Sequence, residues 1–356
     1  MAAVLETRSR LRDSISVVFA SLRLAAGMAV YVVRGYTPAF AYQSLIRLFT
    51  LTSGRSNDLL ARLIGWLRRP YPIEGIDGVL GFQSRADLDR VARQLKERGY
   101  CVFDRQLPDA LCERLYQFAL TEPCRPRATD AQVAPADAPP EPYPRSAPAA
   151  IIYDFAPNDL INSEVVQELM ADRSICALAE AYLGARPVLD TVNLWWTTAY
   201  SSQPDRAAAQ LFHFDMDHVR WLKFFVYLTD MSQDSGPHCF VAGTHRSGSI
   251  PRKFLSQGYA RLSDADIASS FSPADVLEFN GLRGTIIVED TRGLHKGKPA
   301  LRGDRLMFEL EFSNSLFGAV LPGRGELTVF HRPGFAAFVA RHRRIFSRWM
   351  GARLPL

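Results

Sequence analysis

Hydrophobic residues recur along the chain with two different spacings. Residues 1–75 and 331–356 place Leu, Ile, Phe and Trp at helical spacing, with arginines between them. Residues 184–330 instead contain short apolar or alternating runs separated by turn residues, which is typical of β-strands. We therefore expect a basic amphipathic helical segment over 1–75, a mainly β domain over 76–330 and an amphipathic C-terminal helix over 331–356.

The domain over 76–330 is predicted to begin with helices and to continue mainly as strands. Helices are expected over 84–98, over about 109–120 and between 164 and 183. The proline- and alanine-rich residues 122–148 are expected to form a mobile loop. The clearest strands are DTVNLWWTTAY, WLKFFVYLTD, GTIIVED and RLMFELEF. Many short strands favour a sandwich, a jelly roll or a barrel, so the expected fold class is mainly β with flanking helices (α+β).

The N-terminal helical region combines an apolar stretch with positive charge. Residues 14–33 are long and apolar enough to cross a bilayer, but Arg23 near their centre argues against a spanning helix. Residues 1–70 hold ten arginines against three acidic residues, and residues 331–356 hold six arginines and no acidic residue. Two interpretations stay open. These ends lie on an anionic membrane surface, or they pack their apolar faces on the domain and expose only their arginines.

Nucleic acid and an oxidising compartment fit the sequence less well. No recognised nucleic-acid-binding motif accompanies the arginines, so nucleic acid is not expected as a partner. The five cysteines form no CxxC pair and show no regular spacing, which argues against a disulfide framework and against a structural zinc cluster. We expect a cytoplasmic protein, with peripheral attachment to a membrane as a hypothesis.

The segment QLFHFDMDHVR carries the first candidate chemistry. His213 and Asp215 are two residues apart in an apparent strand, so both side chains are expected to reach one ion from the same face. His295 follows the predicted strand GTIIVED, and two histidines with one carboxylate are the ligand set of non-haem iron(II) oxygenases. In a regular strand Asp217 would share the ligand face, whereas His218 would point away.

Arg305 is the candidate for anchoring 2-oxoglutarate. An iron centre of this kind needs a group that fixes the far carboxylate of its co-substrate, and a guanidinium binds a carboxylate through two parallel hydrogen bonds. Arg305 begins the predicted strand RLMFELEF, ten residues after His295. Arg302 lies in the preceding turn and is the weaker candidate.

Three stretches resemble the phytanoyl-CoA dioxygenase family of iron(II)- and 2-oxoglutarate-dependent oxygenases. They are HFD at 213–215, FVYLTDMSQDSGPHCFVAGTHR at 225–246 and DTRGLHKGKPALRGDR at 290–305. The resemblance covers approximately residues 85–315. It implies a double-stranded β-helix, a jelly-roll or cupin-like core, in which His213, Asp215 and His295 bind Fe(II). Arg305 would bind 2-oxoglutarate, and dioxygen would be the other co-substrate.

Further contacts to the co-substrate are less clear from the sequence. Lys223, Phe225 and Tyr227 share one face of a predicted strand, so any of them is a candidate contact for 2-oxoglutarate, and a packed strand face is the alternative. Asp290 or Thr291, just before the third predicted ligand, is expected to orient that histidine.

The expected activity is hydroxylation of a small molecule with release of succinate and CO2. Asp215 favours hydroxylation over chlorination, because related halogenating enzymes carry a small residue in place of this carboxylate. The basic aromatic ends suggest an acyl chain or a lipid as the substrate. Two other hypotheses stay open: a membrane-associated barrel that binds or scaffolds without turnover, and a metal enzyme that does not use 2-oxoglutarate.

Overall fold

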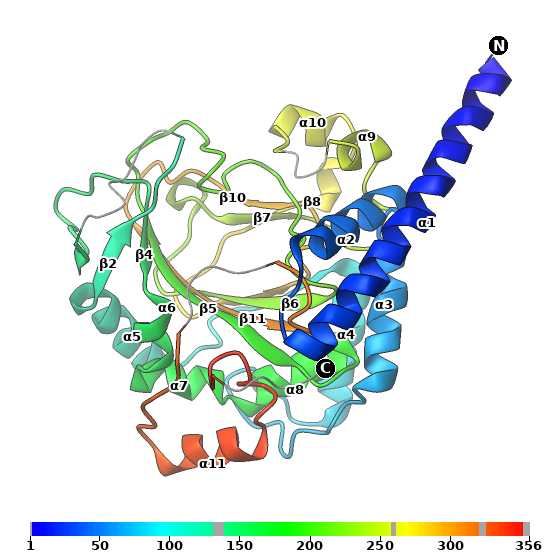
Figure 1. The fold of residues 1–356 in the computed structure, drawn as a ribbon. Coiled ribbons are helices and arrows are strands. Elements are labelled where there is room, and N and C mark those ends of the chain that lie inside the picture. Colours follow the sequence, from blue (N-terminus) through cyan, green and yellow to red (C-terminus); the bar gives the residue numbers. More distant parts are fainter. Residues whose placement is uncertain (1, 131–138, 258–260, 320–324, 352–356) are drawn as a thin grey trace.

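The computed structural model describes residues 2–130, 139–257, 261–319 and 325–351, and it contains two antiparallel sheets surrounded by helices (Figure 1). Across the larger sheet the strands are β1 (Tyr100–Phe103), β9 (Ile286–Glu289), β6 (Trp221–Tyr227), β11 (Arg305–Ser313), β5 (Val188–Thr197), β4 (Ile152–Phe155), β2 (Pro123–Pro126) and β3 (Glu141–Pro142). The smaller sheet consists of β10 (His295–Gly297), β7 (His238–Val241) and β8 (Val276–Phe279). This mixture of helices and antiparallel sheets is consistent with a jelly roll, and the four clearest predicted strands are present as β5, β6, β9 and β11.

The helices lie mainly before and beside the sheets. They are α1 (Ala2–Arg34), α2 (Ala39–Thr52), α3 (Arg55–Leu67), α4 (Arg85–Arg98), α5 (Asp109–Thr121), α6 (Pro157–Ile161), α7 (Glu164–Met170), α8 (Arg173–Leu183), α9 (Arg252–Leu255), α10 (Asp264–Ala268) and α11 (Pro333–Arg341). Ser84 caps the start of α4, where its side chain accepts a hydrogen bond from the backbone N–H of Asp87. Gly99, in the left-handed conformation, caps the end of the helix. The stretch 164–183 is two helices because Asp172 caps the start of α8.

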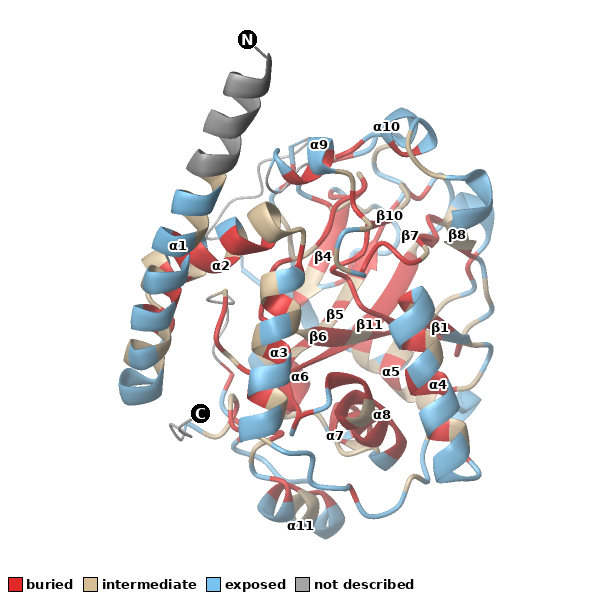
Figure 2. Ribbon diagram, turned by 90° about the vertical axis from the view of Figure 1, so that its right-hand side faces the viewer, coloured by how far each residue is buried: buried red, intermediate tan, exposed pale blue. Residues whose placement is uncertain are grey.

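The larger sheet has two different faces. Along β11, Leu306, Phe308 and Leu310 lie in the core that packs against α4, α5, α7 and α8. Alternate residues of a strand point to opposite faces, so Glu309 and Glu311 point toward the smaller sheet. Figure 2 shows the buried strands enclosed between the helices. The face of the larger sheet that points toward the smaller sheet, here called the inner face, therefore carries buried charged side chains such as Glu309 and Glu311.

The predicted loop over 122–148 contains regular structure at both ends. Residues Pro123 and Cys124 of β2 pair with Pro142 and Glu141 of β3 at the edge of the larger sheet. Proline is tolerated there because an edge strand does not need every backbone N–H for pairing. Residues 131–138 lie outside the described part of the chain, so for them the mobile loop stays a prediction.

The C-terminal helix is much shorter than predicted. Helix α11 has nine residues, and turns follow it to Met350. The turns carry Trp349 back to the core, where its indole N–H donates to the carbonyl of Leu189 over 2.9 Å. Phe335 and Phe346 are buried in the same core, so these apolar side chains pack on the domain. This packing agrees with the interpretation that the segment places apolar side chains on the domain, and contact of residues 331–356 with a membrane stays a hypothesis.

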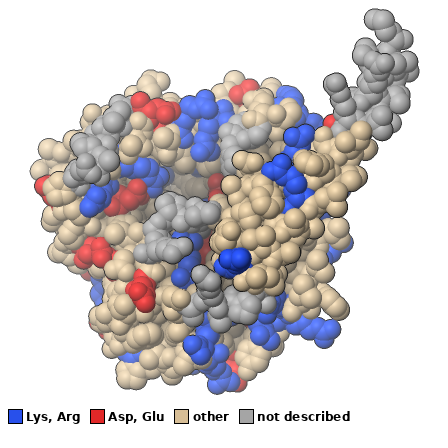
Figure 3. All heavy atoms as spheres, viewed as in Figure 1, with Lys and Arg blue, Asp and Glu red and all other residues tan. Residues whose placement is uncertain are grey.

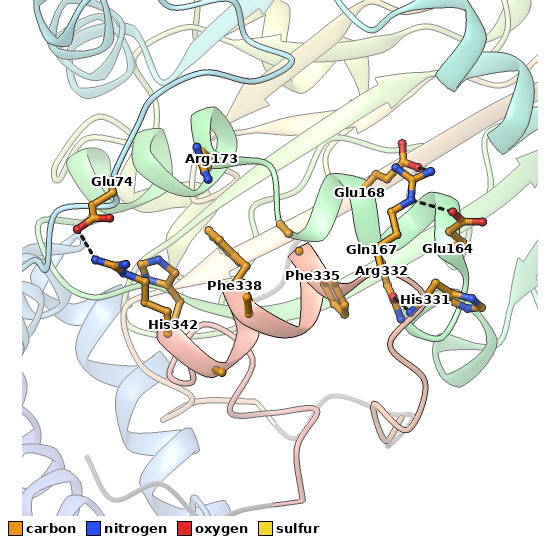
Figure 4. A pocket seen from close by; sticks show the side chains of 15 residues that line it. Glu74, Glu164, Gln167, Glu168, Arg173, His331, Arg332, Phe335, Phe338 and His342 are labelled. Carbon is orange, nitrogen blue, oxygen red and sulfur yellow. Dashed lines mark hydrogen bonds and ion pairs between the residues drawn. The ribbon is translucent and has the colours of Figure 1, made fainter.

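A surface groove separates α11 from α7. Figure 4 shows Phe335 and Phe338 on one side of it and Glu164 and Glu168 on the other, with Arg332 reaching across to Glu164. The distance from Arg332 Nε to the Glu164 carboxylate is 2.8 Å. None of the predicted metal ligands lines this groove, so the predicted metal site lies elsewhere.

Helix α1 contains a stretch that could cross a membrane by length and composition. It runs over Asp13–Arg34, has a mean hydropathy of 1.8 and is 17% buried. One stripe, including Ala20 and Leu24, packs against Leu45 of α2. The rest of the stretch is mostly exposed, so packing on the domain accounts for only part of its apolar surface.

Glu180 on α8 offers a test of burial inside the helical layer. It is 7% exposed, and burial raises its pKa to about 7 from the ordinary 4.5. The unfolded chain loses this proton near pH 4.5 and the folded chain near pH 7, so stability falls as pH rises through that window. Glu180→Gln should therefore raise the free energy of unfolding by about 2 kcal/mol at pH 8 and have little effect at pH 4. Urea unfolding at both pH values, with exposed Glu97→Gln as control, measures this; equal effects at the two pH values would contradict it.

Candidate metal centre

The three predicted metal ligands lie together beside the smaller sheet. Asp215 Oδ1 lies 3.7 Å from His213 Nε2, and Asp215 Oδ2 lies 3.5 Å from His295 Nε2. The two imidazole ring centroids are 4.3 Å apart, and one ligand atom from each residue falls within 4.8 Å of the others. Both histidines are buried and Asp215 is partly buried, so one ion can reach all three side chains.

Backbone contacts, not a regular strand, place these ligands. The expectation that His213 and Asp215 share a strand is wrong, because His213 forms only an isolated bridge with His295. In that bridge the backbone N–H of each histidine donates to the carbonyl of the other, over 3.0 and 2.8 Å. The Asp215 N–H donates to the carbonyl of Thr291 over 2.8 Å. The segment before β6 is thereby fixed to the segment that leads into β10.

Both histidines present an unprotonated Nε2 to the centre. His213 Nδ1 lies 2.9 Å from the carbonyl of Leu211, and His295 Nδ1 lies 2.9 Å from the carbonyl of Gly293. A carbonyl only accepts, so each Nδ1 carries the proton and leaves a lone pair on Nε2. We expected the side chain of Asp290 or Thr291 to orient His295. The group that orients it is instead the backbone carbonyl of Gly293. This ligand set fits a divalent metal ion.

Local electrostatics keep the histidines neutral and the carboxylate charged. Burial lowers the pKa of His295 to about 4 and takes that of His213 well below its ordinary value. Burial alone would raise the pKa of Asp215, but Lys223 and the two histidines outweigh it and lower the pKa far below its usual range. At neutral pH the centre therefore offers the protonation states that metal binding requires.

Lys223 is enclosed by carboxylates on the inner face of the larger sheet. Its Nζ lies 2.9 Å from Asp215, 3.6 Å from Asp217, 3.4 Å from Glu309 and 3.2 Å from Glu311. These carboxylates raise the pKa of Lys223 well above its ordinary value although burial opposes them. Lys223 is therefore the counter-charge of this cluster, and Asp217 belongs to the cluster and not to the group of metal ligands.

Arg305 lies beside the strand that carries the third ligand. Its guanidinium donates to the carbonyl of Gly236 and, over 3.0 Å, to the hydroxyl of Thr197. A Cβ added to Gly297 would lie 3.1 Å from the Arg305 guanidinium. Gly297 follows His295 by two residues on β10, so the arginine and the ligand are near the same side of the smaller sheet.

Phe225 and Tyr227 form part of the packing between the sheets. The Tyr227 hydroxyl donates to the carbonyl of Phe279 over 2.9 Å and accepts from the backbone of His238 over 3.0 Å. The ring of Phe225 lies 4.9 Å from that of His238. Phe225 and Tyr227 therefore belong to a packed strand face beside the centre, and their contact with a co-substrate is a proposal.

His238 and Glu289 were not predicted from the sequence. His238 Nε2 lies 2.7 Å from the Glu289 carboxylate, and its ring lies 5.7 Å from the ring of His295. Burial lowers the pKa of His238 to about 3 and raises that of Glu289 well above its ordinary value. The one signal in the sequence was an acidic residue inside the otherwise apolar run IIVE, which marks a buried carboxylate.

Comparison with known proteins identifies the family. A sequence model described as "Phytanoyl-CoA dioxygenase (PhyH)" matches residues 95–299. No curated protein is similar enough in sequence to count as a match. Among solved structures, the non-haem α-ketoglutarate-dependent epimerase SnoN from nogalamycin biosynthesis is 16% identical, with a TM-score of 0.45 over 65% of this chain and 84% of that chain. HygX from Streptomyces hygroscopicus, with nickel and 2-oxoglutarate bound, is 15% identical, with a TM-score of 0.46 over 67% of this chain and 89% of that chain.

These structural similarities are too distant to indicate chemistry, whereas the family match spans more than half of the chain. The expected iron(II) and 2-oxoglutarate are the cofactor and co-substrate of that family. The chain belongs to the phytanoyl-CoA dioxygenase family.

Proposed function

We propose that this chain is an iron(II)- and 2-oxoglutarate-dependent oxygenase with a double-stranded β-helix core over residues 76–330. His213, Asp215 and His295 hold the ion. The observation that carries the proposal is the convergence of two unprotonated imidazole nitrogens and one carboxylate beside a buried arginine. When bound, iron(II) and 2-oxoglutarate supply oxidation of a C–H bond by dioxygen, with succinate and CO2 as by-products. The backbone carbonyls of Leu211 and Gly293 orient the two histidines, and the side chains packed around the centre exclude water.

Arg305 is suited to bind the far carboxylate of 2-oxoglutarate. It is 5% exposed, and among the described residues the ionisable groups acting on it are Tyr227 and Cys239, not a carboxylate. Its Nε has no hydrogen-bond partner among those residues. Burying a charge without a counter-charge is costly, and a dicarboxylic acid would supply both the charge and the missing acceptor. Phe225 and Tyr227 would pack beside that acid.

Substitution of Arg305 tests the binding of 2-oxoglutarate. Arg305→Lys should raise the KM for 2-oxoglutarate by about 10–100-fold, because a charge-assisted hydrogen bond contributes about 1.5–3 kcal/mol. Succinate release in the presence of iron(II), oxygen and ascorbate measures it. Exposed Arg302→Lys is the matched control and should leave the KM unchanged. A wild-type chain that binds iron, stays folded and forms no succinate would favour a binding module or a metal enzyme without 2-oxoglutarate.

Hydroxylation of a small molecule, such as an acyl chain or a lipid, is the proposed outcome. Asp215 supports it because the carboxylate occupies the ligand position that a halide would need. A membrane substrate is supported by the exposed apolar residues of the N-terminal helices. On α1 and α3 these include Ile15, Val18, Phe19, Leu22, Leu59, Leu63, Trp66 and Leu67, which are here called the N-terminal apolar surface.

The N-terminal apolar surface combines large apolar side chains with arginines. Phe19 is 59% exposed, Leu22 66% and Trp66 67%, and monomeric domains seldom leave many such residues together on one side. Helices α1 and α3 lie on the same side of the molecule (Figures 1 and 2). Figure 3 shows mostly uncharged atoms over α1, with basic side chains nearby. The Arg23 guanidinium lies 5.6 Å from the ring centre of Phe19, a position compatible with a lipid headgroup layer. We infer peripheral attachment of a cytoplasmic enzyme to an anionic membrane.

Liposome sedimentation tests this attachment. The double substitution Phe19→Ser and Leu22→Ser should weaken binding to anionic vesicles by at least about 10-fold, since each removes a side chain that contributes about 1.5–3 kcal/mol when buried. Leu282→Ser and Leu301→Ser, which replace exposed leucines away from these helices, form the matched control. Unchanged binding in the first variant would contradict the inference. Resistance to alkaline extraction would instead indicate that residues 14–33 insert into the bilayer.

A further inference from the structure

A second group of metal-ligating side chains lies on the inner face of the larger sheet. It consists of Asp190 on β5, His218 before β6 and Glu311 on β11. One ligand atom from each lies within 4.8 Å of the others, and His218 Nε2 lies 2.9 Å from the Asp190 carboxylate. All three residues are at most 1% exposed. None of them belongs to the proposed iron site.

The backbone turns Asp190 toward this group. Thr191 pairs with Glu311 and Leu189 pairs with Phe312, so Asp190 is the extra residue of a β-bulge. A bulge interrupts the alternation of a strand and re-aims a side chain, and bulges are frequent beside functional sites. Asp190 therefore faces Glu311, although regular alternation from Thr191 would direct it to the other side.

Close packing fixes the histidine. A Cβ added to Gly318 would lie 2.7 Å from His218 Nδ1, and the two residues form an isolated bridge. Only a residue without a side chain permits this approach, so the imidazole has little freedom to turn away from Asp190.

Several atoms of this group make no hydrogen bond of regular geometry. In the described part of the chain this holds for both oxygens of Asp190, both ring nitrogens of His218 and Oε1 of Glu311, although His218 Nε2 lies 2.9 Å from Asp190. The other oxygen of Glu311 lies 3.2 Å from Lys223. The hydroxyl of Ser313, two residues further along the same face of β11, also has no partner. Each such buried group is expensive unless something outside the described protein atoms satisfies it.

Charge also favours a cation here. Among the described residues, Lys223 and Arg348 are the cations whose charges act on the carboxylates of this region. Apart from Asp215 of the proposed iron site, the surrounding carboxylates are Asp190, Asp217, Glu309 and Glu311, and they outnumber these cations. A buried region with more carboxylates than cations is stabilised by a divalent ion.

We propose that Asp190, His218 and Glu311 bind a second divalent transition-metal ion, such as zinc or manganese. Metal–nitrogen and metal–oxygen bonds are about 2.1 Å long, so neighbouring ligands lie about 3.0 Å apart around an octahedral ion and about 3.4 Å apart around tetrahedral zinc. The 2.9 Å between His218 and Asp190 matches the octahedral spacing. The site is closed to solvent, so its ion is structural, and Lys223 separates it from the iron ligands. The proposal goes beyond the proposed oxygenase activity and does not depend on it.

Metal counting in a variant without the proposed iron ligands tests the second site. The full chain carrying His213→Ala and His295→Ala is purified from cells grown with zinc and manganese, and its metal content is measured by plasma mass spectrometry. We expect close to one ion per chain. Adding His218→Gln to this variant should remove that ion. Zinc or manganese should raise the melting temperature of the first, metal-stripped variant and not that of the second.

Two results would overturn the proposal. One is a folded His213→Ala, His295→Ala chain that is purified without metal and is not stabilised by zinc or manganese, in which case the group is a closed ion pair. The other is a metal content that His218→Gln leaves unchanged. If the His218 variant does not fold, the count in the first variant still decides. Neither result bears on the oxygenase activity of the unsubstituted chain, so the two proposals fail separately.

Discussion

Replacing Lys223 with methionine should lower the free energy of unfolding by about 3–5 kcal/mol, the effect expected when one partner of a buried ion pair is removed. Lys223 lies within ion-pair distance of Asp215, Asp217, Glu309 and Glu311. Without it these carboxylates lose their nearest cation in a region that is largely closed to water. Urea unfolding at pH 7.5, followed by circular dichroism, measures the loss.

The pH dependence of the same variant separates charge from packing. Burial, and then Asp215, already raise the pKa of Asp217 to about 6, and that of Glu311 also lies above its ordinary value. Removing the ammonium group raises both further, so the variant should recover stability as pH falls and the carboxylates take up protons. A pH-independent loss would show that methionine disturbs packing only.

A surface lysine supplies the control for Lys223. Lys298 lies 2.7 Å from Glu278, but both side chains are more than a quarter exposed. Lys298→Met should therefore lower stability by less than about 1 kcal/mol, because exposed ion pairs contribute little. Similar losses in the two variants would contradict the view that Lys223 holds a buried cluster of carboxylates together.

Replacing His295 with alanine should abolish iron binding and reduce succinate formation by more than about 100-fold. Loss of an outer-sphere partner already lowers metal affinity or activity by about 10–100-fold, and His295 is proposed as a direct ligand. Its Nε2 lies 3.5 Å from Asp215, and its backbone pairs with that of His213. Iron content after gel filtration and succinate release give two independent readouts.

The control for His295 is a histidine remote from the centre. His331 lies in the groove beside α11, where its Nε2 lies 2.7 Å from the carbonyl of Asn162. His331→Ala should keep full iron content. An iron-loaded, active His295→Ala chain with an unchanged melting temperature would contradict the assignment of this ligand.

Local patterns in the sequence were enough to predict the strands β5, β6, β9 and β11 and to select the three candidate ligands. The alternation in RLMFELEF places Leu306, Phe308 and Leu310 on the helix-covered face, as β11 shows. Alternation could not predict the conformation of the segment that contains His213, because isolated bridges to residues far away in the sequence hold that segment. Backbone contacts with His295 and Thr291 bring His213 and Asp215 together, whereas we expected a regular strand to do so.

Other features depended on contacts that sequence spacing does not report. The C-terminal helix ends early because Trp349 is buried and bonded to Leu189, a residue 160 positions away. The pairing of His238 with Glu289 joins β7 to β9, and neither residue forms a motif with its neighbours. The aim of Asp190 follows from a bulge, which periodicity cannot show.

The most direct test of the oxygenase assignment is anaerobic titration of the purified chain with iron(II) and 2-oxoglutarate, followed by visible absorption. We expect a metal-to-ligand charge-transfer band that forms only with both additions, is absent in His213→Ala and is weaker in Arg305→Ala. A folded, iron-loaded wild-type chain that gives no such band would contradict binding of 2-oxoglutarate to the ion held by His213, Asp215 and His295.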